Sequence, residues 1–280
     1  MRRKIEEYYQ ELGLDKNEGR NCPSYVKCVN SLILQDKDKK LLPPVGAYVG
    51  HSYEDRRILF VGINPNMNWN KKYGFDSCKD WISADDAWIA GTIHRIMKKI
   101  LGNAELQPED TKDSFAFTNA VKCSTNNDFA TPSDVMHINC LYQNKYLFEE
   151  IGILKPKLIV AFGDTPFNAI RNEFINSVVI INHLFTNWIF NVSIDDMSTT
   201  VIGLYNPGQG YRTPRSIFKK IREEKNIGEE WKLFMSDDLK KEIDWAKTLE
   251  NIYLEKNRID KANPFYDAIF DKLIQIAGYP

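Results

Sequence analysis

Asparagine residues follow three of the four apolar segments that are typical of buried strands in this sequence. The apolar segments are 57–62, 114–118, 157–162 and 200–204. A carboxamide presents one acceptor and two donors in one plane, so Asn64, Asn119 and Asn206 could together read the edge of a nucleobase. Asparagine is also common in turns, where its side chain bonds to the backbone, and this structural role is the alternative for each of the three.

The five cysteines are the second group of residues that could do chemistry. Cys22 and Cys28 lie close together, Cys123 and Cys140 are separated by sixteen residues, and Cys78 stands alone. No signal peptide is recognisable, so we expect free thiols, a metal site or catalysis instead of a disulfide framework. Thiolates favour an iron–sulfur cluster, zinc is the alternative ion, and simple burial of the thiols is the third interpretation.

The charge balance excludes a protein that is basic throughout. Lys and Arg number 37 and Asp and Glu number 38 among 280 residues, which gives a net charge of −1. Any contact with nucleic acid must therefore depend on a local group of cations, and residues 212–225 hold six Lys and Arg against two Glu. A solvated helix face is the alternative for this segment. No apolar run reaches the roughly 18–20 residues of a membrane helix, so we expect a cytoplasmic protein without membrane contact.

Alternating strands and helices must position these residues. Helical patterns occur at 1–13, which ends at Gly13, at 85–101, at 133–154, which begins with Ser133 as N-cap, and at 165–173. A further strand or a hairpin is expected at 178–192, and residues 14–56 are expected to be irregular. This order predicts a three-layer α/β/α sandwich with a central, mainly parallel four-stranded sheet, in which ligands bind beyond the carboxyl ends of the strands.

Two further helical patterns, at 229–256 and 264–278, predict a C-terminal helical extension. The second pattern carries Phe265, Ile269, Leu273 and Ile276 at helical spacing. We therefore divide the chain into a main domain, residues 1–225, and an extension, residues 226–280.

The motifs around the strand ends resemble those of the uracil-DNA glycosylase superfamily. They are GINPN at 62–66, FTNAVKC at 117–123, LKPKLIVAFG at 154–163 and GLYNP at 203–207. They occur in the order of that family and cover about residues 20–225. Together with Cys140, they are most similar to the iron–sulfur type known as family four.

The resemblance implies a pocket that reads uracil after the nucleotide has left the DNA stack. Asn119 would accept from N3–H and donate to O4, a pattern that cytosine does not match. The substrate-binding residues implied are Gly62, Ile63, Pro65, Phe75 and Asn119. Phe75 would stack on the base, and its alternatives for that place are Trp69, Tyr73 and Trp81.

Two of the implied catalytic residues depart from the family pattern. Asn64 stands where the iron–sulfur type usually has an acidic residue, and an amide cannot act as a general base near neutral pH. It would orient the attacking water, which predicts modest turnover. Asn206 replaces the usual histidine and would donate an uncharged hydrogen bond to uracil O2. These departures leave the substrate range open, with uracil in mismatches, hypoxanthine and another damaged base as the alternatives.

The resemblance also implies a DNA-binding loop and a cluster. The DNA-binding residues would be Gly208, Gln209, Tyr211, Arg212 and Arg215, with Gln209 or Tyr211 filling the vacated stack. Four cysteines would hold a structural 4Fe-4S cluster, namely Cys22, Cys28, Cys123 and Cys140. In the family, two residues normally separate the first pair, whereas five lie between Cys22 and Cys28.

The sequence thus predicts a monomeric DNA glycosylase that removes uracil, or a related deaminated base, and leaves an abasic site. Its partner would be DNA containing the damaged base, and it would need no nucleotide cofactor. The altered motifs keep a second interpretation open, a noncatalytic nucleic-acid-binding or damage-sensing protein on the same fold. The nearly neutral charge keeps a third open, a hydrolase of free nucleosides.

Overall fold

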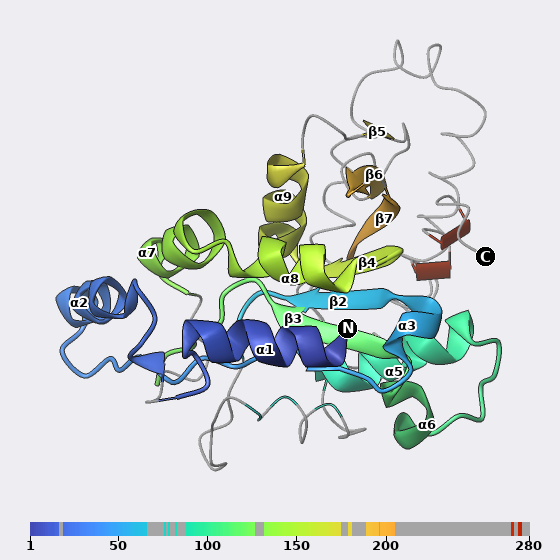
Figure 1. Cartoon of the computed structure of the whole chain (residues 1–280), viewed down its shortest axis with the longest axis horizontal. Helices are drawn as coiled ribbons and strands as arrows, with labels where there is room; N and C mark the ends of the chain where they lie inside the picture. The colour runs from blue at the N-terminus through green and yellow to red at the C-terminus, as the bar shows by residue number, and fades with distance from the viewer. Residues whose placement is uncertain are drawn as a thin grey trace, which may run out of the picture.

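The fold is an α/β arrangement with one mixed sheet between helices, and the coordinates are a computed structural model (Figure 1). The structure describes residues 1–16, 19–65, 76, 78, 82, 88–126, 132–174, 179–180, 189–195, 197–204, 270–271 and 274–275. Among these residues, no helix is long and apolar enough to cross a membrane.

The sheet has seven strands among the described residues, in the order β1-β3-β2-β4-β7-β6-β5. They are β1 Tyr48–Val49, β2 Ile58–Gly62, β3 Phe115–Asn119, β4 Leu158–Phe162, β5 Val179–Ile180, β6 Ile189–Ile194 and β7 Met197–Leu204. The four central strands β3, β2, β4 and β7 run parallel, which confirms the parallel core that the apolar segments predict.

The predicted count of four strands is too low, because antiparallel strands extend both sides of the parallel core. β1 pairs with β3, β6 pairs with β7, and β5 pairs with β6. β6 and β5 fall in the segment where a further strand or a hairpin is expected. β1 is not predicted, because two residues are too few to show the alternation of apolar and polar side chains that indicates a strand.

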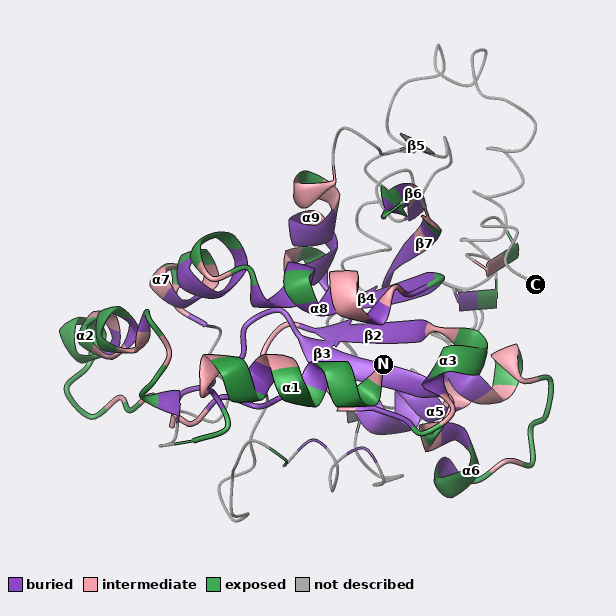
Figure 2. Ribbon diagram, viewed as in Figure 1, coloured by how far each residue is buried: buried purple, intermediate pink, exposed green. Residues whose placement is uncertain are grey.

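Helices cover both faces of the sheet, which gives the expected three layers (Figure 1). They are α1 Arg2–Leu12, α2 Tyr25–Gln35, α3 Tyr53–Arg56, α5 Trp88–Ile100, α6 Pro108–Lys112, α7 Asp134–His137, the π-helix η2 Ile138–Gln143, α8 Tyr146–Leu154 and α9 Asp164–Glu173. Side chains alternate along β2, so Leu59 and Val61 pack toward α1 and α8, whereas Ile58 and Phe60 pack toward α5. The strands β2, β3 and β4 are buried along their whole length (Figure 2).

The first predicted helix is confirmed as α1, which buries Ile5 and Tyr9 and ends at Gly13. Gly13 has a φ of 63°, the left-handed conformation that favours glycine at a helix end. The prediction that 14–56 is irregular is wrong, because α2 lies in this segment. Its apolar face is hard to recognise, since it leaves Val26 and Leu34 largely exposed.

The single helix expected at 133–154 is three elements in the structure. Ser133 is the N-cap, as predicted, and its Oγ accepts from the backbone N–H of Met136 at 3.3 Å. The chain then passes through the π-helix η2, and a left-handed residue, Lys145 with a φ of 53°, separates η2 from α8. The apolar pattern continues across this break, so it hides the break from the sequence.

The described residues of the C-terminal extension pack on the core against α5. Phe270 is 1% exposed and lies in the same apolar cluster as Ile93 and Met97 of α5, with Ile274 against that cluster. Asp271 pairs with Lys99 at 2.7 Å. The four apolar residues at helical spacing in the second pattern lie outside the described residues, namely Phe265, Ile269, Leu273 and Ile276. The helix expected at 229–256 and the basic segment 212–225 also lie outside them.

Replacing Phe270 by Ala should lower the free energy of unfolding by about 3–5 kcal/mol, because it leaves a cavity among packed side chains. Denaturant unfolding followed by circular dichroism measures this change. Asp271→Ala is the matched control on the same helical turn, and it should cost about 0–1 kcal/mol because the ion pair is exposed. Equal effects of the two substitutions would contradict the packing described.

Candidate functional site

The ends of β2 and β3 bring the predicted base-reading residues together. The two strands are parallel, and Gly62 is the register partner of Asn119. Beyond the strands, the backbone N–H of Ala120 donates to Gly62 O at 2.9 Å, and that of Val121 donates to Ile63 O at 2.8 Å. The structure therefore places the segments 62–65 and 119–121 side by side at the carboxyl edge, where ligands of such sheets bind.

Asn119 lies directly against Gly62. The side chain of Asn119 is 5% exposed, and a Cβ added to Gly62 would lie 2.6 Å from Asn119 Oδ1. It would also lie 3.2 Å from the ring of Phe117. Only glycine leaves room for the carboxamide here, so the glycine of the first motif and the asparagine of the second form one unit.

Asn64 lies in the turn that follows β2 and is partly buried. Its Nδ2 donates to the backbone oxygen of the next residue, Pro65, at 3.3 Å. This is the type of local bond that suits asparagine to turns. The structure thus gives Asn64 a turn contact and, at the same time, a position two residues from the Gly62–Asn119 unit.

The remaining residues proposed for the base and the DNA lie outside the described residues. They are Phe75 with its alternatives Trp69, Tyr73 and Trp81, and Asn206, Gly208, Gln209, Tyr211, Arg212 and Arg215. β7 ends at Leu204, whose backbone oxygen accepts from Gly163 N at 2.6 Å. β7 therefore ends at the same carboxyl edge.

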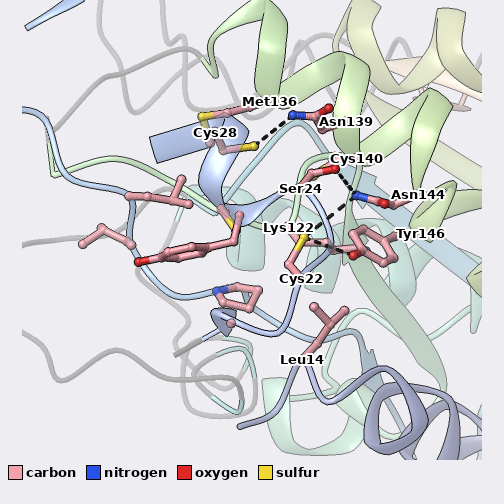
Figure 3. A pocket seen from close by; sticks show the side chains of 16 residues that line it. Leu14, Cys22, Ser24, Cys28, Lys122, Met136, Asn139, Cys140, Asn144 and Tyr146 are labelled. Atoms are coloured by element: carbon pink, nitrogen blue, oxygen red, sulfur yellow. Dashed lines mark hydrogen bonds between the residues drawn. The ribbon is translucent and has the colours of Figure 1, made fainter. Parts of the chain in front are cut away.

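Four cysteines line one pocket on the α1 side of the sheet (Figure 3). Cys22 precedes α2, Cys28 lies in α2, Cys123 follows β3, and Cys140 lies in η2. The empty space between the lining residues is about 440 Å³, a figure that includes open solvent. The structure therefore brings together the four cysteines that the sequence singles out, whereas Cys78 packs in the apolar cluster on the opposite face.

Polar side chains contact two of the sulfurs (Figure 3). Asn139 Nδ2 donates to Cys28 Sγ at 3.2 Å, and Tyr146 Oη lies 3.2 Å from Cys22 Sγ. Asn144 Nδ2 donates to Ser24 Oγ at 3.1 Å and lies 3.9 Å from Cys22 Sγ. The sequence analysis missed these three residues. Their only signal is that two amides lie within about one helical turn of Cys140.

Burial opposes ionisation of the Cys123 and Cys140 thiols. It raises the pKa of Cys140 to about 12 and the pKa of Cys123 well above its ordinary value. The nearby cysteines raise the pKa of Cys123 further, and the Lys122 ammonium partly opposes this rise. Among the described residues, no three His, Cys, Asp or Glu side chains are grouped to hold one metal ion.

A buried ion pair lies between the pocket and Asn119. Lys122 Nζ lies 2.5 Å from Glu150 Oε1, and the two side chains are 1% and 0% exposed. Thr118 Oγ1 and Lys122 Nζ each donate to Glu150 Oε2 at 2.6 Å, and Lys122 Nζ also donates to Thr118 Oγ1 at 2.6 Å. Tyr9 of α1 donates to Glu150 Oε1. The sequence analysis did not find this network.

The fold and the carboxyl-edge site agree with a comparison with known families. The model of the uracil DNA glycosylase superfamily matches residues 49–226, more than half of the chain. The chain therefore belongs to the uracil DNA glycosylase superfamily. The matched segment contains Asn64, Asn119, Cys123 and Cys140, whereas Cys22 and Cys28 precede it. A comparison with curated proteins gave no match.

Gly62→Ala should lower the free energy of unfolding by about 1–3 kcal/mol, because the new methyl group overlaps Asn119 Oδ1 and the Phe117 ring. Gly152→Ala is the control. Gly152 lies inside α8, and no atom would meet its added Cβ within 4 Å, so alanine should raise stability there by about 0.5–1 kcal/mol. Denaturant unfolding of both variants tests the contact, and two changes of the same sign would contradict it.

Proposed function

We propose that the protein is a DNA glycosylase that hydrolyses the N-glycosidic bond of uracil, or of a related deaminated base, in DNA. Superfamily membership supports glycosylase activity on deaminated bases. The observation that carries the finer proposal is the contact of Asn119 with Gly62 at the carboxyl edge. It holds a carboxamide in a fixed position, facing the same side of the sheet as Phe117.

Recognition would begin with extrusion of the nucleotide, because a base inside a duplex cannot be attacked at its glycosidic bond. Asn119 Oδ1 would accept from N3–H of uracil, and Nδ2 would donate to O4. Cytosine presents the opposite pattern at these atoms, which would leave a buried amide unpaired. Such a mismatch rejects the wrong base strongly.

Hydrolysis would break the N–C1′ bond and form a new C1′–O bond to water. The bonding electron pair leaves with the uracil anion, so stabilisation of charge contributes most of the catalysis. Asn64 would orient the water by a hydrogen bond, and the water proton would leave late, since an amide is not a base at neutral pH. Asn206 would donate to uracil O2 without carrying a charge.

We also propose that Cys22, Cys28, Cys123 and Cys140 hold a 4Fe-4S cluster of structural function. Four thiols from four segments line one pocket, and Asn139 and Tyr146 contact two of the sulfurs, as donors near cluster sulfurs do. Zinc has less support, because four sulfurs would all have to lie about 2.3 Å from one ion, and in the described part of the chain no three ligands are grouped in that way. When bound, the cluster would cross-link the N-terminal segment to the loop after β3.

Asn119→Ala should lower kcat/KM for uracil excision by at least about 100-fold, because it removes both base-edge hydrogen bonds. Asn64→Ala should lower kcat by about 100-fold through loss of the oriented water. The assay incubates the protein with oligonucleotides that carry one uracil in single strands, U·A and U·G pairs, or one hypoxanthine, and then cleaves abasic sites with alkali.

The parent protein decides between the proposal and its alternatives in the same assay. Absence of cleavage in all four contexts would overturn the glycosylase proposal. Tight binding to uracil-containing DNA without cleavage would indicate a damage sensor. Base release from free nucleosides alone would indicate a small-molecule hydrolase.

Protein purified without oxygen should show broad visible absorption and contain about four iron atoms per chain. Cys28→Ala should abolish both signals, because it removes one of the four ligands. Cys78→Ala is the matched control, since this buried cysteine lies on the opposite face of the sheet and should leave the iron content unchanged. A colourless parent protein without iron would reject the cluster.

A further inference from the structure

We propose that Lys122 and Glu150 are positioning residues that hold Asn119 in its base-reading place. The inference rests on the role proposed for Asn119, and the structural part of it can be tested without any activity. The two side chains form a nearly completely buried ion pair, 1% and 0% exposed, on the face of the sheet opposite to the Asn119 side chain.

The pair brackets Asn119 along the chain. Glu150 Oε2 accepts from Thr118, which directly precedes Asn119, and from Lys122, which follows it by three residues, each at 2.6 Å. Lys122 Nζ closes the ring by donating to Thr118 Oγ1 at 2.6 Å. The segment between Thr118 and Lys122 is therefore held at both ends by one carboxylate of α8.

The backbone of the bracketed segment is held from other directions. Ala120 and Val121 donate to the oxygens of Gly62 and Ile63, and Val45 N donates to Lys122 O at 2.8 Å. These bonds hold the backbone of the segment beside residues 62–63 and 45. They do not fix the orientation of its side chains. The ring of Thr118, Lys122 and Glu150 adds this constraint from the face opposite to the Asn119 side chain.

The rest of the Glu150 carboxylate is also used. Its Oε1 lies 2.5 Å from Lys122 Nζ and accepts from Tyr9 Oη, and that hydroxyl in turn accepts from Ala47 N at 2.9 Å. Tyr9 of α1 therefore binds the carboxylate oxygen that Thr118 does not contact. Both carboxylate oxygens have partners, as a buried charge requires.

A gain in folding stability does not by itself explain why an ion pair is buried here. Desolvation of two buried charges offsets much of their attraction, and apolar pairs of similar volume are often as stable. Unlike apolar contacts, the hydrogen bonds of a charged ring are directional, since each donor must point at its acceptor oxygen. The feature of this region that requires a defined orientation is the placement of Asn119.

The test uses the full chain and the double variant Lys122→Met/Glu150→Gln, which removes both charges with little change of volume. Its melting temperature first establishes that it folds. The single-turnover rate of uracil excision at saturating enzyme should then fall about 10- to 100-fold, since a small misplacement of a positioned group has this effect. Affinity for the same DNA without uracil should change less than about threefold, because only the placement of the base reader is altered.

The control is Lys145→Met/Glu173→Gln, an exposed ion pair at 2.7 Å, which should leave the excision rate unchanged. Hydrogen–deuterium exchange is the second readout. Peptides covering 118–123 should exchange faster in the Lys122/Glu150 variant, whereas peptides from α5 should not. If the double variant does not fold, Thr118→Val keeps the ion pair but breaks the ring, and should give the same two effects.

Each outcome decides the proposal. A folded variant with the parent excision rate, or with unchanged exchange at 118–123, overturns it. If the parent protein excises no base, the proposed function fails, and the exchange data alone then decide whether the pair holds the Asn119 segment. A loss of rate that is matched by an equal loss of affinity for undamaged DNA would indicate a general structural role and would also overturn the positioning role.

Discussion

The parallel pairing of β2 with β3, with Gly62 beside Asn119, is the constraint on which the rest of the site depends. Side chains alternate along a strand, so this register puts Asn119 on the α5 face with Phe117 and turns Thr118 toward α8. A slip by one residue would exchange these faces. It would remove Asn119 from Gly62 and Thr118 from Glu150 in a single step.

One short loop connects Asn119 to the cysteine pocket. Asn119 ends β3, Lys122 contributes to both the ion pair and the pocket lining, and Cys123 follows it. A group bound to the four cysteines would therefore restrain the same segment that Glu150 holds from α8. The pocket and the carboxyl-edge site are two ends of one structural unit, even though the side chains that define them face different layers.

The sequence predicts those parts of the structure that follow from local pattern. The central strands are apolar runs with polar ends, and their parallel order makes the convergence of Asn64 with Asn119 predictable. The ring of Thr118, Lys122 and Glu150 is not predictable in this way, because Glu150 lies 28 residues from Lys122 and the sequence does not distinguish it from its neighbour Glu149 in the same helix. The break before α8 is not predictable from the sequence, because the apolar pattern continues through it. Cys22 precedes α2 and Cys28 lies one turn inside it, so both line the pocket although five residues separate them.

Residues outside the family match support the site from both faces. Tyr9, which precedes the matched segment, completes the partners of Glu150 on the α1 face. Phe270, which follows it, packs with α5 in the cluster that contains Phe60 and Phe117, and Phe117 in turn lies beside the Gly62–Asn119 contact. The matched residues 49–226 contain Gly62, Asn119 and Glu150, and side chains from both terminal segments pack around them. A chain cut to the match would keep Asn119 and lose both of these neighbouring side chains.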